Sequence, residues 1–266
     1  MSMLEIHQLS MDLRDSDHER SLLRSISLEV DSGESLGLVG ESGSGKSLTL
    51  KSILRVPPGN ARISGSILFN GSDVLLMNRK ELRNFRATKV AMIAQNPHGV
   101  LNPVLTIQQF MLEGMSVAGK HTRREALRIS CEMLEDVGIR DVMRVMKSYP
   151  HELSGGMLQR VVIAAAIAAG PSIILADEPT TALDVTTQAE VVAILDELRR
   201  DRGLAMIFVT HDLDLAAAMC SRIAVMKQGE IVEQGSVEHI YEDAQHDYTK
   251  KLMDSKPELI HWAESE

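Results

Sequence analysis

Residues 40–47 read Gly-Glu-Ser-Gly-Ser-Gly-Lys-Ser and directly follow an apolar run at 35–39, Ser-Leu-Gly-Leu-Val. This glycine spacing, ending in Lys46 and Ser47, is typical of a loop whose backbone N–H groups surround phosphate oxygens. The apolar run predicts a buried strand that enters the loop. A helix predicted from Ser47 to Leu54 would point its positive dipole end at the same anion. The alternative, an ordinary loop, is a poorer account of this pattern with a strand before it and a helix after it.

We therefore predict a nucleoside triphosphate site at this loop. Lys46 would place a positive charge beside the β- and γ-phosphates, and the Ser47 hydroxyl would bind Mg²⁺. The residues expected to line the site are Gly40, Glu41, Ser42, Gly43, Ser44, Gly45, Lys46, Ser47 and Leu48.

The composition is that of an ordinary globular protein. Hydrophobic residues make up 44% and charged residues 24% of 266 residues, which is enough for one large domain with a substantial core. The formal net charge of -9 argues against broad attraction to nucleic acid or anionic lipid. Cys131 and Cys220 lie far apart in helix-like surroundings, so we expect buried small side chains and no disulfide or thiolate metal site.

The sequence predicts neither a membrane span nor a signal peptide. The longest apolar run, Val161 to Ala169, is about half the length of a span, and the start of the chain lacks a basic segment followed by an apolar one. We expect a cytoplasmic protein, or one held at the inner face of a membrane by another component. The 15 methionines are expected to fill the core.

Alternating apolar and polar residues predict a β-rich first part of the chain. Strands are expected at Leu4–Asp12, Ser25–Val30 and Arg62–Phe69, with Asn70-Gly71 as a tight turn after the third. A polar segment, Asn78 to Arg86, then precedes a predicted core strand at Val90–Ala94.

The second part of the chain is mostly helical and then alternates. Helix is favoured from Thr106 to about Met146, and Arg123–Val137 has an apolar side made of Ala126, Leu127, Ile129, Met133 and Leu134. From Pro150 onward, helices and strands alternate, which predicts βαβ units and a largely parallel sheet. The expected elements are helix Gly156–Ala169, strand Ser172–Ala176, helix Thr187–Arg200, strand Ala205–Thr210, helix Leu213–Cys220, and a hairpin of Ile223–Met226 with Glu230–Glu233. A polar tail containing Trp262 begins at His239.

Two adjacent carboxylates end the predicted strand at 172–176. Buried Asp and Glu side chains are rare without a partner, and an Mg²⁺ ion held by Ser47 and the triphosphate would supply one for Asp177. Glu178 would then orient and polarise an attacking water. The simpler alternative is a surface turn after a core strand.

Residues 153–160, Leu-Ser-Gly-Gly-Met-Leu-Gln-Arg, lie between the phosphate loop and the carboxylates and begin a helix. Ser154 can cap this helix, and the glycines at 155 and 156 leave its first N–H groups uncovered, which predicts a second anion site. Taken alone, the segment is equally compatible with an ordinary capped helix.

These segments, in this order, resemble the ATP-binding subunits of ABC transporters over almost the whole chain. Residues 153–159 match the family signature, Gln95 matches the glutamine of the Q-loop, 182–184 match the D-loop, and His211 matches the switch histidine. The resemblance implies an α/β fold with a mainly parallel core sheet, an N-terminal antiparallel β subdomain and a helical subdomain. Residues 1–266 would form a single domain, with the helical subdomain at about 100–155 and a C-terminal tail at about 240–266.

In that family two such subunits sandwich two ATP molecules, with the phosphate loop of one facing the signature of the other. The residues that would contact a nucleotide in this way are Ser154, Gly155, Gly156, Gln159 and Asp184. The resemblance implies catalytic roles for Glu178, His211 and Lys46, and Mg²⁺ contacts for Ser47, Gln95 and Asp177. Gln95 would also pass the state of the site to a membrane subunit. The simpler alternatives are a polar strand end for Gln95 and a helix cap for His211.

One family feature is missing. ABC ATPases usually stack an aromatic residue on adenine, but no Phe, Tyr or Trp stands between Asp12 and Arg24. His18 could stack there, and a solvated loop histidine is an equally good interpretation. The nucleotide is therefore inferred to be ATP from the family alone.

Within the family, four short segments resemble those of the importers of peptides and nickel. They are Gln95-Asn-Pro, residues 101–104 (Leu-Asn-Pro-Val), residues 149–152 (Tyr-Pro-His-Glu) and residues 177–185. Residues 246–250, followed by Pro257, resemble the tail of that group, although Asp247 replaces its usual proline. The short chain favours the nickel or metal-chelate branch. Such a subunit would work at the cytoplasmic face of the inner membrane with two permease subunits, a second ATPase or a copy of itself, and indirectly a solute-binding protein.

Other interpretations remain open. The chain could be a soluble ABC ATPase in a non-transport enzyme complex, such as the carbon–phosphorus lyase system, whose components resemble this group. It could also be a regulatory module that binds ATP only to dimerise, although Glu178 and His211 are present. ABC proteins of nucleic-acid maintenance are a poorer match because no long coiled-coil insertion interrupts the motifs.

Overall fold

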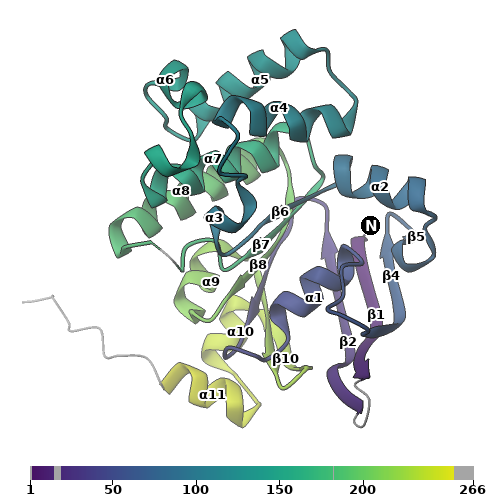
Figure 1. Cartoon of the computed structure of the whole chain (residues 1–266). Helices are drawn as coiled ribbons and strands as arrows, with labels where there is room; N and C mark the ends of the chain where they lie inside the picture. The colour runs from purple at the N-terminus through teal and green to yellow at the C-terminus, as the bar shows by residue number, and fades with distance from the viewer. Residues whose placement is uncertain (1, 15–18, 182, 255–266) are drawn as a thin grey trace, which may run out of the picture.

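The computed structural model describes residues 2–14, 19–181 and 183–254. His18, Ala182, Pro257 and Trp262 therefore lie outside the described residues. Two sheets organise the chain, with strand orders β2-β1-β4-β5 and β10-β9-β3-β8-β7-β6. The predicted α/β fold with an N-terminal antiparallel sheet and a mainly parallel core sheet is confirmed (Figure 1).

The core sheet is built from apolar strands that are buried on both faces. Parallel pairing joins β3 (Ser35–Val39) to β8 (Ala205–Thr210) and β9 (Arg222–Lys227), and joins β7 (Ile173–Asp177) to β8 and to β6 (Val90–Ile93). Among the described strands of this sheet, only β10 (Glu230–Ser236) runs antiparallel, in the hairpin that the sequence predicts. Because parallel strands end at the same edge, the segments after β3, β6, β7 and β8 meet there.

The N-terminal sheet is antiparallel throughout. It contains β1 (Ser2–Arg14), β2 (Glu19–Asp31), β4 (Arg62–Phe69) and the short β5 (Ser72–Asp73). Two backbone hydrogen bonds connect this sheet to the phosphate loop through the β9–β10 turn. The Arg24 N–H of the sheet donates to the Gly229 oxygen of the turn (2.7 Å), and the Gly229 N–H donates to the Ser44 oxygen of the loop (2.8 Å).

Successive residues of the central strands belong to different hydrophobic clusters. In β7 and β8, Leu175, Ile207 and Val209 face the cluster shared with the N-terminal sheet, whereas Ala176 and Phe208 face the cluster shared with the helices. This alternation follows from the period of two in a strand. The core sheet therefore forms the middle layer between two apolar cores.

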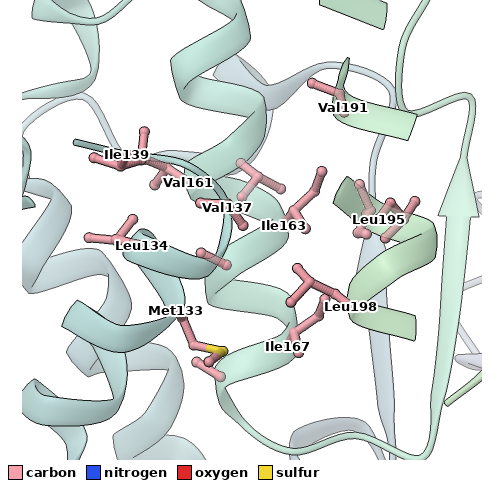
Figure 2. Packing of buried hydrophobic residues seen from close by; sticks show 14 of the residues in the cluster. Met133, Leu134, Val137, Ile139, Val161, Ile163, Ile167, Val191, Leu195 and Leu198 are labelled. Carbon is pink, nitrogen blue, oxygen red and sulfur yellow. The ribbon is translucent and has the colours of Figure 1, made fainter. Parts of the chain in front are cut away.

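A group of helices packs on one face of the core sheet. The group comprises α3 (Pro97–Val100), α4 (Ile107–Ala118), α5 (Arg123–Asp136), α6 (Val142–Lys147), the 3-10 turn η2 (Pro150–Glu152), α7 (Gly155–Ala168) and α8 (Val185–Asp201). Of these, α4, α5 and α6 lie at the top of Figure 1. Capping boxes at Thr106–Gln109 and Thr122–Glu125 begin α4 and α5. Figure 2 shows α5, α7 and α8 packed through side chains such as Leu134, Ile163 and Leu195.

Some side chains lie differently from the prediction. Leu127 was expected on the apolar side of α5, but it is 37% exposed because it lies at the margin of the buried stripe. Cys131, on the same helix, is only partly buried, whereas Cys220 is buried as expected.

Outside this group lie α1 (Lys46–Ile53), η1 (Val74–Leu76) and α9 (Leu213–Met219). The polar segment predicted at 78–86 forms helix α2 (Arg79–Thr88). The part of the C-terminal segment that is described is not simply a polar tail. It forms α10 (Val237–Glu242) and α11 (Asp247–Asp254), which bury Ile240 and Tyr248 against the core sheet. Within the described part of the chain, no helix has the length and apolar character needed to cross a membrane.

Candidate functional site

The phosphate loop connects β3 to α1, and its glycines are required by close contacts. A Cβ on Gly40 would lie 2.1 Å from the backbone oxygen of Met226. Gly45 has φ 111°, and its Cβ would lie 2.7 Å from the Met226 methyl carbon. A side chain at position 40 would displace the β9–β10 hairpin, and one at position 45 would be strained by the positive φ. The loop is thus held tightly against that hairpin.

Lys46 lies buried under the loop with an exposed fraction of 4%. Its Nζ donates to the backbone oxygens of Gly40 (2.7 Å) and Glu41 (2.9 Å). Burial lowers the pKa of Lys46 below the usual 10.5, although Glu178, Asp177 and Glu41 oppose this shift. The Ser44 hydroxyl is also buried and has no hydrogen-bond partner among the described residues. A buried ammonium and an unpaired hydroxyl fit an anion bound in the loop.

Ser47 and Asp177 lie side by side. The Ser47 hydroxyl donates to Asp177 Oδ1 at 2.7 Å, which joins the start of α1 to the end of β7. Burial raises the pKa of Asp177 above the usual 3.8, and the hydrogen bond from Ser47 opposes this shift. These oxygens fit a hard divalent cation that also binds phosphate oxygens. The described residues include no cluster of three or more His, Cys, Asp or Glu that could hold a metal alone.

Glu178 is the centre of the site. Its Oε2 accepts hydrogen bonds from Gln95 Nε2 (3.1 Å) and Thr181 Oγ1 (3.0 Å), and His211 Nδ1 lies 3.7 Å away. Its Oε1 lies 3.9 Å from Lys46 Nζ. The backbone at Glu178 is left-handed, with φ 45°, which turns the chain sharply after β7. Residues from β6, β7, β8 and the phosphate loop therefore converge on one carboxylate.

A cavity beside this carboxylate is lined by Ser42, Gly43, Gly45, Lys46, Ser47, Leu48, Gln95 and Glu178. Ser154, Gly155 and Gly156 are not among its lining residues. The signature instead begins α7, where the Ser154 hydroxyl accepts a hydrogen bond from Met157 N–H at 3.4 Å. The structure therefore does not bring the signature to the phosphate loop of the same chain.

Asp184 caps α8 next to the signature. Its carboxylate accepts hydrogen bonds from the Thr187 N–H (3.0 Å) and hydroxyl (2.7 Å), which lower the pKa of Asp184. A Cβ on Gly156 would lie 2.6 Å from the Thr187 methyl carbon. Close packing thus connects the signature to Asp184 through Thr187.

Gln159 does not fit the expected nucleotide contact. Its side chain is 1% exposed, and its Nε2 has no hydrogen-bond partner among the described residues. The residue points into the core because it lies on the inner side of α7, which the signature pattern does not reveal.

A second cavity shares Gly43 and Leu48 with the first. Its other lining residues are Arg20, Ser21, Leu22, Arg24 and Gln228. Sequence reasoning missed these residues, although two arginines next to the missing aromatic position were a visible signal. No aromatic side chain lines this cavity among the described residues.

With this geometry established, comparison with known proteins gives the family. The model for "ABC transporter" matches residues 23–181. The chain belongs to the ABC transporter family. This ABC protein is 41% identical over 258 residues to a probable peptide ABC transporter ATP-binding protein of Sinorhizobium fredii, covering 96% of this chain and 77% of the relative. It is 40% identical over 267 residues to the oligopeptide transport ATP-binding protein OppD of Bacillus subtilis, covering 99% of this chain and 74% of that protein.

The ABC fold is also matched by a solved structure. A dimeric ATP-binding cassette in a post-hydrolysis state, bound to ADP and Pi, has a TM-score of 0.78 and 28% identity to this ABC chain. The match covers 88% of this chain and 99% of that one. This ABC chain is accordingly an ATP-binding cassette and an ATPase.

Proposed function

We propose that this chain is the ATP-hydrolysing subunit of a peptide importer. The observation that carries the proposal is the convergence of Gln95, Lys46 and His211 on Glu178, beside a loop shaped for phosphate. Phosphoryl transfer depends mainly on positioning and electrostatic stabilisation, and this cluster supplies both.

The cluster suggests a role for each residue. Lys46 would move its ammonium from the loop carbonyls to the β- and γ-phosphate oxygens. Ser47 and Asp177, with Gln95 beside them, would hold Mg²⁺, which when bound neutralises charge on those oxygens. Glu178 would orient the attacking water and take its proton while the bond between the γ-phosphorus and the β,γ-bridging oxygen breaks. His211 would contact the γ-phosphate as ADP and inorganic phosphate form.

The base of the nucleotide would lie in the second cavity. With the γ-phosphate beside Glu178, the nucleoside would extend the other way, past Gly43 and Leu48, which line both cavities. There a guanidinium plane of Arg20 or Arg24 can stack on the base, because a cation binds the face of an aromatic ring. This arrangement would replace the missing aromatic residue.

A second subunit would complete the site. Ser154, Gly155 and Gly156 are separated from the phosphate loop of their own chain, and the related cassette bound to ADP and Pi is a dimer. We infer that these residues contact a nucleotide held by a copy of this chain or by a related ATPase. Asp184 would lie at the same junction, while Gln159 would support it from the core.

A permease surface is suggested near Gln95. Val104 is 73% exposed and Val100 is 39% exposed in the segment that follows Gln95, where large apolar side chains gain from being covered by a partner. We infer peripheral attachment to two permeases at the cytoplasmic face of the membrane. A solute-binding protein would contact the permeases and not this chain.

Peptides are a better proposal than nickel chelates. The names of both relatives compared above refer to peptide or oligopeptide transport. They give no support to the nickel or metal-chelate branch that the sequence analysis favours. The solute itself would be chosen by the binding protein and permeases.

The experiment is a mild-detergent pull-down of the tagged chain from its native cells, followed by mass spectrometry and a peptide-stimulated ATPase assay. Recovery of two permeases and peptide-stimulated turnover would support the importer. Recovery of soluble enzymes without any permease would reject it and favour a non-transport complex. Binding of ATP without turnover in the recovered complex would favour a regulatory module.

A further inference from the structure

The C-terminal helix α11 contacts the phosphate loop directly. The backbone N–H of Glu41 donates a hydrogen bond to the Tyr248 hydroxyl oxygen at 3.1 Å, although the two residues are 207 positions apart. Tyr248 is 6% exposed, so the contact is partly buried. A hydrogen bond in such surroundings is costly to leave unmade.

The contact holds one particular peptide group. The carbonyl oxygen of Gly40 and the N–H of Glu41 belong to the same planar unit. Lys46 Nζ donates to that oxygen at 2.7 Å, while the N–H on the opposite side donates to Tyr248. The orientation of this peptide is therefore fixed from both sides, by the lysine of the loop and by the C-terminal helix.

Tyr248 is itself held firmly in place. Its ring packs with Val39, the last residue of β3, in the cluster under α10 and α11. The Lys227 ammonium lies 4.8 Å from the ring centroid, which adds a cation–π contact. The Tyr248 N–H also donates to His246 Nδ1 at 3.0 Å.

Glu233 on β10 anchors the start of α11. Its carboxylate accepts hydrogen bonds from the N–H groups of Gln245 (2.6 Å) and His246 (3.2 Å). Burial alone would raise the pKa of Glu233, but the pKa lies below the usual 4.5 because the N–H groups of Gln245 and His246 and the nearby His239 favour the ionised carboxylate. The carboxylate therefore stays ionised and keeps the helix docked at neutral pH.

We propose that Tyr248 is a positioning residue for ATP binding: its hydroxyl fixes the Gly40–Glu41 peptide and so keeps the phosphate loop in a binding-competent arrangement. The inference rests on the proposed function only in that the loop binds a triphosphate. Without the hydroxyl, the Glu41 N–H loses its partner and the peptide can rotate. The loop must then be ordered when ATP binds, which weakens binding.

Tyr248→Phe tests this role, because it removes one oxygen and leaves the packed ring in place. We expect the Kd for ATP of the isolated chain to rise roughly three- to tenfold, the range of one net hydrogen bond. Binding of inorganic tripolyphosphate should weaken by the same factor, whereas kcat at saturating ATP should stay within about twofold. Tyr241→Phe is the matched control, because its hydroxyl donates to Asp214 Oδ1 at 2.6 Å on the neighbouring helix and not to the loop. Its Kd should be unchanged.

Hydrogen exchange separates positioning from general loosening. In Tyr248→Phe, peptides covering residues 40–46 should exchange faster, and saturating ATP should restore their protection. Peptides from β7 and β8 should exchange as in the wild type. An unchanged Kd with unchanged exchange at the loop would overturn the inference. A uniform rise in exchange would also overturn it, because it indicates a purely structural role. A wild-type chain that binds neither ATP nor tripolyphosphate would instead reject the proposed function.

Discussion

The side-chain amide of Gln95 donates a hydrogen bond to the Glu178 carboxylate at 3.1 Å. Gln95 follows β6, and Glu178 follows the neighbouring strand β7, so the pairing of these strands places the two side chains together. Thr181 donates to the same carboxylate oxygen at 3.0 Å. Glu178 is therefore oriented by side chains of its own chain.

Glu178→Gln should bind ATP normally and hydrolyse it very slowly. The amide keeps the size of the side chain but cannot accept a proton from water, so we expect kcat to fall by about a hundredfold or more. ATP binding by calorimetry and steady-state phosphate release check this. Near-normal turnover would remove Glu178 as the catalytic base.

ATP binding should begin to weaken at a lower pH than it would if Lys46 were an exposed lysine with its usual pKa. Burial lowers the pKa of Lys46 below the usual 10.5, so its charge is lost at a lower pH than that of an exposed lysine. The unfolded chain keeps this proton longer, and the Lys46 contribution to folding stability therefore rises with pH between the folded and unfolded pKa values.

Lys46→Arg provides the control for this pH effect, since a guanidinium stays charged over the whole range. The Kd for ATP, measured by calorimetry from neutral pH upward, should rise with pH in the wild type and stay flat in the variant. Equal slopes in the two proteins would contradict a role for Lys46 deprotonation.

Gly156→Ala should reduce turnover, and Thr187→Ser should restore it. The new Cβ would lie 2.6 Å from the Thr187 methyl carbon, and Thr187 cannot rotate away without losing its 2.7 Å hydrogen bond to Asp184. We expect steady-state ATPase activity to fall by about tenfold, which corresponds to a rise of roughly 1.4 kcal/mol in the activation free energy. ATP binding to the isolated chain should not change.

Serine at position 187 keeps the hydroxyl and removes the methyl group. The double variant Gly156→Ala, Thr187→Ser should therefore recover most of the lost turnover. Failure of this rescue would show that the added methyl group acts through some contact other than Thr187.

The base site should tolerate bases other than adenine. Stacking on a guanidinium and contact with Leu22 and Leu48 favour no particular base edge, because every base has a π face. We expect GTP and ATP to be hydrolysed with kcat/KM values within about tenfold of each other. A preference for ATP well above this range would require a specific contact with the adenine edge.

The arginine contribution is tested separately. Arg20→Ala with Arg24→Ala should weaken ATP and GTP binding, while tripolyphosphate binding changes little. Exposed Arg124→Ala on α5 is the control. If Lys at positions 20 and 24 preserves full affinity, charge attraction and not planar stacking holds the nucleotide.

Local patterns predicted much of the fold and of the phosphate site. The strands at 35–39, 62–69 and 205–210 begin and end as expected, because each is an apolar or alternating run between turn residues. The convergence of Gln95 and His211 on Glu178 was not itself predicted, although segments that follow parallel strands meet at one edge of a sheet. The short helices α10 and α11 were missed because six to eight residues give little periodic signal, although Ser236 caps α10. The pairing of Glu41 with Tyr248 was beyond local reasoning, since distant contacts depend on the whole fold.

The alternation of β7 and β8 between two hydrophobic clusters restricts how this chain can vary in length. Deleting one residue from β7 would turn Leu175 toward the helices and Ala176 toward the N-terminal sheet, because side chains alternate with a period of two. The same deletion would draw Asp177 back from the sheet edge, away from Ser47. Single-residue insertions and deletions in these strands should therefore be absent from functional variants, even though the surface loops accept them.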